Sequence, residues 1–340
     1  MTFPRNHWYV AARSSEIGND LTARMICGEH VVMYRPSTGA VAALDDRCPH
    51  RGFPLSAGTL IGDELQCGYH GLRFDSCGTC VSVPGQDRIP SRANVPTRPV
   101  VEQGAWIWIW MGDPDRADLA RLPATPWFDD EHWASVDGME PLPARYSLLI
   151  DNLLDLSHET FLHDGYIGTP EVAETPIETT VDDAGVVRVR RQMTSVECPR
   201  FYAESAGLTS PIDRSQDIEY HAPGFYLLHV RVAPAGAQPG PDGTDPDAAH
   251  VKVLYAITPV DDHRTLDFWA VARDFALDDE SIDAGVAEMN RAVVLQDVDA
   301  LSLIEERLGD DRAPTEVSFK IDTGGLAARR VIEQLLAAEA

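Results

Sequence analysis

The chain has 340 residues, 44% of them hydrophobic, so it can form two domains with substantial apolar cores. Its 28 basic and 54 acidic residues give a net charge of −26, which argues against nucleic acid as a partner. No apolar run is long enough to span a membrane and the first residues do not resemble a signal peptide, so we expect a cytoplasmic protein without a membrane partner. Six scattered cysteines do not predict a disulfide scaffold.

The first third of the sequence reads as short strands separated by Gly and Pro turns. The clearest strand-like runs are residues 31–34, 41–44, 72–74 and 105–110. This pattern predicts an all-β domain over residues 1–112. A polar, turn-rich stretch at 113–123 predicts a linker, and the second domain is expected over 124–340.

The second domain mixes helical and strand-like patterns. A helical segment is predicted over residues 148–163, and strand-like runs follow at 186–190 and 226–230. Two helices are predicted near the C-terminus. The mixture predicts an α+β domain.

Two short loops of the first domain each offer one thiolate and one imidazole. They are Cys48-Pro49-His50-Arg51-Gly52 and Cys67-Gly68-Tyr69-His70-Gly71. Two cysteines can hold one iron and two histidines the other, which is the ligand set of a Rieske [2Fe–2S] cluster. A Cys2His2 zinc site is the alternative, although zinc sites usually pair cysteine with cysteine and histidine with histidine.

The segment from Asp151 to His163 concentrates polar groups in an apolar helix. On a regular helix one side would carry Asn152, Asp155, His158, Glu159 and His163. A solvated face of an amphipathic helix is the alternative interpretation. The two histidines are five residues apart, so they can share a metal only if the helix bends or ends between them.

A carboxylate for the same metal is predicted at Asp297. It lies at the centre of an apolar helical stripe made of Val286, Asn290, Val293, Val294, Val298, Leu301, Ile304 and Leu308. A buried acid paired with Arg291 or Arg307 is the alternative. Two imidazoles and one carboxylate are the ligands of a mononuclear Fe(II) site that keeps open positions for O2.

These residues resemble the Rieske non-haem iron oxygenases, and within them the monooxygenase branch that contains the vanillate O-demethylase oxygenase component. The resemblance is carried by residues 6–11, both cysteine–histidine loops, 151–163 with 167–168, 296–297 and 321–332. It implies an α+β chain with an N-terminal all-β Rieske domain. The C-terminal catalytic domain is then helix-grip-like, an antiparallel sheet with helices.

The resemblance also implies roles for single residues. The cluster ligands would be Cys48, His50, Cys67 and His70, and the Fe(II) ligands would be His158, His163 and Asp297. Asp155 would carry electrons to the iron from the cluster of a neighbouring subunit in a head-to-tail homotrimer, and Asn152 would lie near the iron.

The implied activity is O-demethylation of a methoxylated aromatic acid such as vanillate, with O2 and with release of formaldehyde. Electrons would come from a separate flavin and iron–sulfur reductase, because the chain has no G-x-G-x-x-G motif of its own. Tyr255 is a candidate substrate contact, and the candidate cations for an acidic substrate are Arg190, Arg191, Arg231 and Arg273. Hydroxylation or N-demethylation of another aromatic compound, a non-catalytic electron carrier and a zinc-stabilised binding module are the alternatives.

Overall fold

The computed structural model describes residues 3–240, 244–311 and 315–340. Contacts divide the chain into two compact units. The N-terminal unit contains residues 5–122 and 258–261, and the C-terminal unit contains the described residues of 123–257 and 262–340 together with 3–4. Each unit is described by itself.

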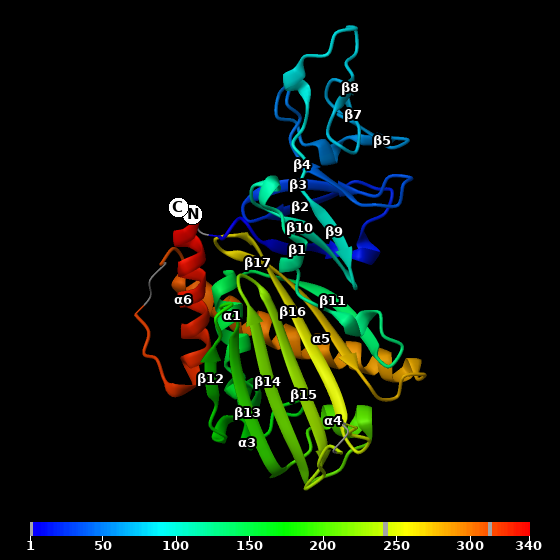
Figure 1. The fold of residues 1–340 in the computed structure, drawn as a ribbon. Coiled ribbons are helices and arrows are strands. Elements are labelled where there is room, and N and C mark those ends of the chain that lie inside the picture. The colour runs from blue at the N-terminus through cyan, green and yellow to red at the C-terminus, as the bar shows by residue number, and fades with distance from the viewer. Residues whose placement is uncertain (1–2, 241–243, 312–314) are drawn as a thin grey trace. The chain divides into compact units, whose positions relative to one another are not determined.

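The N-terminal unit is built from three small antiparallel sheets, which confirms the predicted all-β domain (Figure 1). The first has the order β1-β10-β9, the second β2-β3-β4 and the third β5-β6-β7-β8. Their bounds are β1 Trp8–Arg13, β2 Thr22–Ile26, β3 Glu29–Tyr34, β4 Ala42–Asp45, β5 Thr59–Ile61, β6 Glu64–Gln66, β7 Arg73–Phe74, β8 Cys80–Ser82, β9 Val100–Gln103 and β10 Trp106–Trp110.

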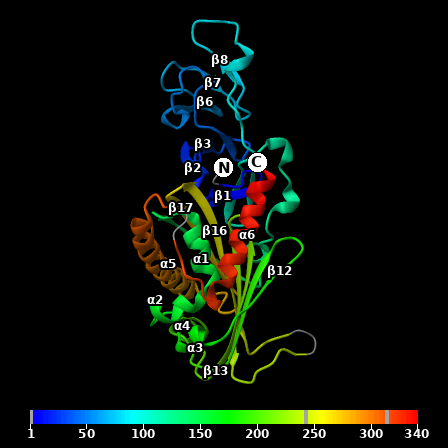
Figure 2. The ribbon, with the colours of Figure 1, turned by 90° about the vertical axis from the view of Figure 1, so that its left-hand side faces the viewer.

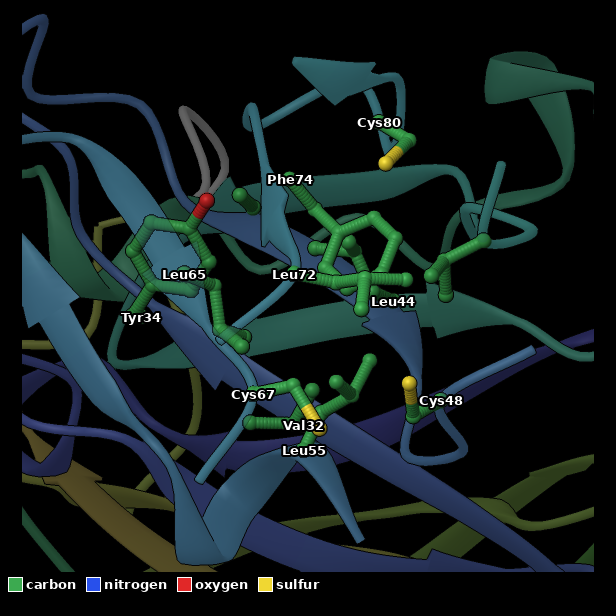
Figure 3. Packing of buried hydrophobic residues seen from close by; sticks show 12 residues of the cluster. Val32, Tyr34, Leu44, Cys48, Leu55, Leu65, Cys67, Leu72, Phe74 and Cys80 are labelled. Atoms are coloured by element: carbon green, nitrogen blue, oxygen red, sulfur yellow. The ribbon is translucent and has the colours of Figure 1, made fainter. Parts of the chain in front are cut away.

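The two predicted ligand cysteines lie inside the apolar core of this unit (Figure 3). Cys48 and Cys67 are 2% and 1% exposed, and they pack among Val32, Leu44, Leu55, Leu65, Leu72 and Phe74. A metal group bound to these thiols would therefore have a dry, low-dielectric environment on its protein side.

The C-terminal unit is organised around one seven-stranded antiparallel sheet with the order β11-β17-β16-β15-β14-β13-β12. Its strands are β11 Ala134–Leu142, β12 Glu178–Val181, β13 Val187–Val196, β14 Ile212–His221, β15 Phe225–Pro234, β16 Ala249–Asp261 and β17 Arg264–Arg273. Buried residues alternate with less buried ones along β13 and β14, so each of these strands turns one row of side chains toward a covered face.

Helices accompany this sheet, as expected for the α+β class. Their bounds are α1 Tyr146–Leu154, α2 Glu159–Leu162, α3 Pro170–Glu174, α4 Arg200–Ala206, α5 Glu280–Leu308 and α6 Thr323–Ala338. The long helix α5 contacts β11 and β17 at one edge of the sheet, whereas α6 contacts β12 and β13 at the opposite edge (Figures 1 and 2). Helix α1 contacts both of them, so the three helices form one layer.

The buried stripe of α5 differs from the predicted one at its C-terminal end. Val286, Val294, Asp297 and Leu301 are buried as expected, but Ile304 is 44% exposed and Glu305 is buried in its place. The reason is an ion pair. The Glu305 carboxylate accepts bonds from Arg145 Nε at 2.7 Å and Arg145 Nη2 at 2.9 Å, and His263 Nδ1 lies 2.7 Å from it. These partners turn Glu305 inward and leave Ile304 on the outer side.

Among the described residues, no helix is both long and apolar enough to cross a membrane.

We expect Glu305→Gln to destabilise the C-terminal unit by about 3 kcal/mol at pH 7, because Arg145 would lose its buried carboxylate partner. Burial raises the pKa of Glu305, but the hydrogen bonds with Arg145 and His263 outweigh this effect and lower the pKa below the ordinary value of 4.5. A group with a depressed folded-state pKa stabilises the fold above its unfolded pKa and ceases to do so as the pH falls through the folded value. The wild-type advantage should therefore shrink below about pH 4.5.

Urea unfolding of both proteins at pH 7 and pH 4 measures this difference. Glu204→Gln is the matched control, since it removes an exposed ion pair with Arg200 and should cost less than about 0.5 kcal/mol. Equal stability of Glu305→Gln and wild type at pH 7 would contradict the assignment.

Candidate metal centres and active-site pocket

The two loops of the N-terminal unit have the same backbone hydrogen bonds. Gly52 N–H donates to Cys48 O at 2.8 Å, and Gly71 N–H donates to Cys67 O at 3.0 Å. Both glycines have positive φ, 72° and 73°, a conformation that other residues rarely adopt. Each loop thus makes the same tight turn and presents its cysteine and histidine in the same way.

The four predicted cluster ligands converge from these two loops. Burial raises the pKa of the Cys48 thiol, and a hydrogen bond with Cys67 raises it further, so the two sulfur atoms are neighbours. The rings of His50 and His70 have centroids 4.5 Å apart, and both residues are exposed. Two buried sulfurs on one side and two accessible imidazoles on the other fit the donor set of a Rieske cluster.

A break in the chain at Asp155 shapes the second site. Helix α1 ends at Leu154, and Asp155 is extended, with φ −122° and ψ 93°. Its carboxylate accepts from Ser157 N–H at 2.9 Å and so caps a new turn, while its carbonyl oxygen lies 2.5 Å from His158 Nδ1. The predicted continuous helix over 148–163 is therefore wrong, because a capping aspartate interrupts it.

The second short helix, α2, ends at Leu162, directly before His163. This end allows the two histidines to face each other, as the five-residue spacing required. The single polar face predicted for a regular helix does not form. Glu159 is 2% exposed and points into the interior of the unit, away from solvent.

His158, His163 and Asp297 meet at one point, and their ligand atoms all lie within 4.8 Å of one another. The Nε2 atoms of the two histidines are 3.2 Å apart, and Asp297 Oδ1 is 3.5 Å and 3.3 Å from them. His163 and Asp297 are 1% and 5% exposed. A buried carboxylate with two imidazoles fits a mononuclear iron, which would compensate its charge.

Hydrogen bonds orient each of these three side chains from behind. His163 Nδ1 lies 2.9 Å from Gln296 Oε1, His158 Nδ1 is held by the Asp155 carbonyl, and Asn152 Nδ2 donates to Asp297 Oδ1 at 3.0 Å. Such bonds fix the imidazole rings so that Nε2 points at the common centre.

The alternative of an arginine partner for Asp297 is not realised. Arg291 instead donates from Nε to Glu140 at 2.6 Å, and no ion pair joins Asp297 to an arginine in the described part of the chain.

A pocket opens from the three metal-site residues into the C-terminal unit. Its walls are mostly apolar, from residues such as Leu156, Ile167, Phe201, Leu228, Val253 and Val271. The predicted contact Tyr255 lines it, together with Tyr226, whose ring centroid is 5.7 Å from that of Tyr255. The arrangement is typical of a small-molecule site, where apolar walls enclose a few polar groups.

Sequence reasoning missed one charged residue of this pocket, Arg214. It comes from β14, is 3% exposed, and donates from Nη2 to Glu159 Oε2 at 3.1 Å. Of the four arginines proposed as substrate cations, Arg190, Arg231 and Arg273 pair with Asp217, Asp245 and Asp283. Arg191 is buried but does not line the pocket. The alternation of apolar and polar residues along β14 was the available signal for Arg214.

Asp155 and His158 also line a groove on the outside of the C-terminal unit. Its apolar part is exposed, with Val317 at 75%, Phe319 at 66% and Ile304 at 44%. Its acidic part includes Asp151, Glu316 and Asp322. On the N-terminal unit, His50 and His70 line a groove of their own with Leu72 and Arg92.

Comparisons with known proteins match both parts of the chain to known domains. Residues 7–96 match the Rieske [2Fe-2S] domain, and residues 142–338 match the vanillate O-demethylase oxygenase C-terminal domain. A vanillate O-demethylase oxygenase subunit from Pseudomonas sp. (strain HR199 / DSM 7063) is 36% identical over 342 residues, covering 99% of this chain and 96% of that protein.

Two further relatives extend the picture. The iron–sulfur subunit of a toluene-4-sulfonate monooxygenase system from Comamonas testosteroni is 32% identical, covering 99% of this chain and 98% of that protein. The crystal structure of dicamba monooxygenase bound to 3,6-dichlorosalicylic acid has a TM-score of 0.91 at 33% identity, covering 100% and 99% of the two chains. The cofactors are therefore a Rieske [2Fe–2S] cluster and a mononuclear iron, and the chain belongs to the vanillate O-demethylase family of Rieske non-haem iron monooxygenase components.

Proposed function

We propose that the chain is the oxygenase component of a system that O-demethylates a methoxylated aromatic acid. The observation that carries the proposal is the pocket itself, in which a His-His-Asp group opens onto apolar walls with two tyrosines. Iron supplies the oxygen-activating chemistry when bound, and the protein supplies position and a dry cavity. One oxygen atom enters the methyl C–H bond and the other becomes water, with two electrons and two protons. The hemiacetal product then splits into a phenol and formaldehyde.

We assign the residue roles on the same basis. Cys48, His50, Cys67 and His70 would hold the cluster, and His158, His163 and Asp297 would hold the iron. Asn152 would fix the Asp297 carboxylate through the bond from its amide. Tyr255, buried in the pocket, would hydrogen-bond a phenol or methoxyl oxygen of the substrate.

Two other functions can be separated from this one. The first is oxidation of a different group, such as an aryl methyl, which the toluene-4-sulfonate relative at 32% identity makes the second candidate. A pure electron carrier would have no use for a metal-binding triad at the wall of a pocket.

We expect the reducing partner to be a separate flavin and iron–sulfur reductase that uses NAD(P)H. The vanillate O-demethylase relative is likewise one subunit, the oxygenase, of its system. We place the chain in the cytoplasm, the compartment that supplies NAD(P)H to such a reductase.

Formaldehyde release tests the activity. Protein reconstituted with iron and sulfide, then supplied with a surrogate reductase, NADH and O2, should convert methoxylated benzoates to phenols with one formaldehyde per phenol. The His163→Ala variant should keep the Rieske visible spectrum and release none. Ring or methyl hydroxylation without formaldehyde would reject O-demethylation and favour the second function.

We further propose that Asp155 passes electrons to the iron site. It lies at the surface groove, and its carbonyl holds the ring of His158. Asp155→Asn should preserve both metals, because an asparagine oxygen can still cap Ser157 N–H. Turnover should fall about 10- to 100-fold. Metal analysis, the visible spectrum and single-turnover kinetics measure this, with Glu316→Gln in the same groove as the control. Unchanged turnover of Asp155→Asn would remove it from the electron path.

The two surface grooves support head-to-tail assembly into a homotrimer. The residues of the N-terminal unit include 12 basic and 14 acidic ones, whereas the rest of the sequence has 16 and 40. Two exposed arginines, Arg47 and Arg51, flank Cys48 and His50 in the sequence, and a third, Arg92, lines the groove that contains His50 and His70. Acidic and exposed apolar residues line the groove of Asp155, together with one arginine, Arg329, which pairs with Asp151 and Glu316. These surfaces are complementary, and a heterologous contact of this kind can close into a ring.

Subunit mixing tests this electron path. Cys67→Ser should lose the cluster and His163→Ala the iron, so each is inactive alone. Coexpressed in equal amounts, they should recover about one quarter of wild-type activity, since a working pair then needs an intact cluster from one chain and an intact iron site from its neighbour. Complete inactivity of correctly assembled, correctly metallated mixtures would show that electrons stay within one chain.

A further inference from the structure

A buried network of charges lies beside the metal-site residues, between α2 and the sheet. Glu159, which begins α2, accepts bonds from Arg214 Nη2 at 3.1 Å and from Gln216 Nε2 at 3.0 Å. Arg191 Nη1 in turn donates to Gln216 Oε1 at 3.1 Å. All four side chains are at most 3% exposed. The mechanism described above uses none of them.

This network has an excess of positive charge. It contains two guanidinium groups, Arg191 and Arg214, and the only carboxylate hydrogen-bonded to either in the described structure is Glu159. Asp155 acts on Arg191 electrostatically but makes no hydrogen bond with it there. Burying a cation without a partner is costly, so the cluster would be stabilised by one more anion.

Two hydrogen-bond donors of the pocket wall have no partner. Arg214 Nε and the Tyr226 hydroxyl are buried and have no hydrogen-bond partner among the described residues. Both residues line the pocket that also contains the metal-site histidines. The other Arg214 nitrogens are occupied, by Glu159 and by the carbonyl of Ile167 at 3.0 Å, and the ring of Tyr202 lies 5.4 Å from its Cζ atom. The guanidinium is therefore held in place while its Nε–H has no partner.

We propose that Arg214 binds the acidic group of the substrate, a carboxylate or sulfonate on an aromatic ring, through its free Nε–H with help from the Tyr226 hydroxyl. This inference rests on the proposed function and names the residue that gives it acid specificity. The anion would balance the second guanidinium of the network, and charge-assisted bonds of this kind are about twice as strong as neutral ones. The Glu159 side chain holds Arg214 in place through a hydrogen bond that a glutamine oxygen could still accept.

A purely structural role is the competing explanation. Glu159 lies directly after His158, so its bonds to Arg214 and Gln216 also attach the histidine-bearing turn to the sheet. The two explanations differ for Glu159→Gln. If Arg214 binds an anion, removing the competing carboxylate leaves affinity for the acid unchanged or increased. If the pair only supports the fold, this variant should lose iron and binding as severely as the loss of Arg214.

The experiment compares 3-methoxybenzoate with the neutral 3-methoxybenzamide by anaerobic calorimetric titration of the holoprotein. Glu159→Gln is measured beside the double variant Glu159→Gln/Arg214→Gln, which removes one negative and one positive charge together and so leaves the net charge of the network unchanged. Arg214→Lys, which keeps a cation, is measured in case the double variant does not fold. Arg190→Gln is the matched control, an arginine on β13 whose side chain is 60% exposed. Iron content and the visible spectrum are recorded for every variant.

We expect wild type and Arg190→Gln to bind the benzoate more tightly than the amide. The double variant should lose about 10- to 100-fold in benzoate affinity and less than about 3-fold in amide affinity. Arg214→Lys should lie between wild type and the double variant. Equal losses for both compounds, or a Glu159→Gln variant as impaired as the double variant, would overturn the role of Arg214. A wild-type protein that demethylates the amide as well as the acid would instead overturn the acidic substrate class of the proposed function.

Discussion

The candidate metal site of the C-terminal unit depends on how the chain turns between Asp155 and His163. A continuous helix would place His158 and His163 about 140° apart, and they could not share a ligand point. The Asp155 carboxylate caps a new turn and its carbonyl fixes the ring of His158, while α2 ends just before His163. From the preceding turn, Asn152 reaches Asp297 on α5. The turn after Asp155 and the end of α2 together let both histidines face one point, where Asp297 of α5 joins them.

Buried ion pairs attach these helical segments to the rest of the unit. Glu159 joins α2 to Arg214 on β14, and Glu305 joins α5 to Arg145, the residue before α1. Burial disfavours a charged carboxylate, but the hydrogen bonds of Arg145 and His263 keep the pKa of Glu305 low. Each pair has a defined geometry, which apolar packing alone would not impose. The positions of His158, His163 and Asp297 therefore rest on electrostatic contacts as well as on the core.

Much of this organisation could be predicted from local patterns. The mixed cysteine–histidine loops identified the Rieske domain, and the acid in the apolar stripe of α5 identified Asp297, which the structure brings to the two histidines. Prediction failed where a distant partner decides the outcome. Helical periodicity predicted a buried Ile304. It could not take account of Arg145, a residue distant in sequence whose ion pair turns Glu305 inward instead. Arg214 was overlooked because a charged residue on a strand is usually expected to be exposed. It lies on the covered face of β14, on the same side as Ile212, Gln216 and Ile218.

The position of Glu159 between the two histidines has a consequence for how this enzyme could be altered. A residue that anchors both the pocket wall and the turn with the candidate metal ligands can change only to a side chain that keeps its hydrogen bonds. Strand residues such as Leu228, Val253 and Tyr255 border the same cavity but make none of the hydrogen bonds described for the triad. Divergence toward new aromatic compounds, in nature or by directed evolution, should therefore accumulate on the sheet, while the turn from Asp155 to His163 stays fixed.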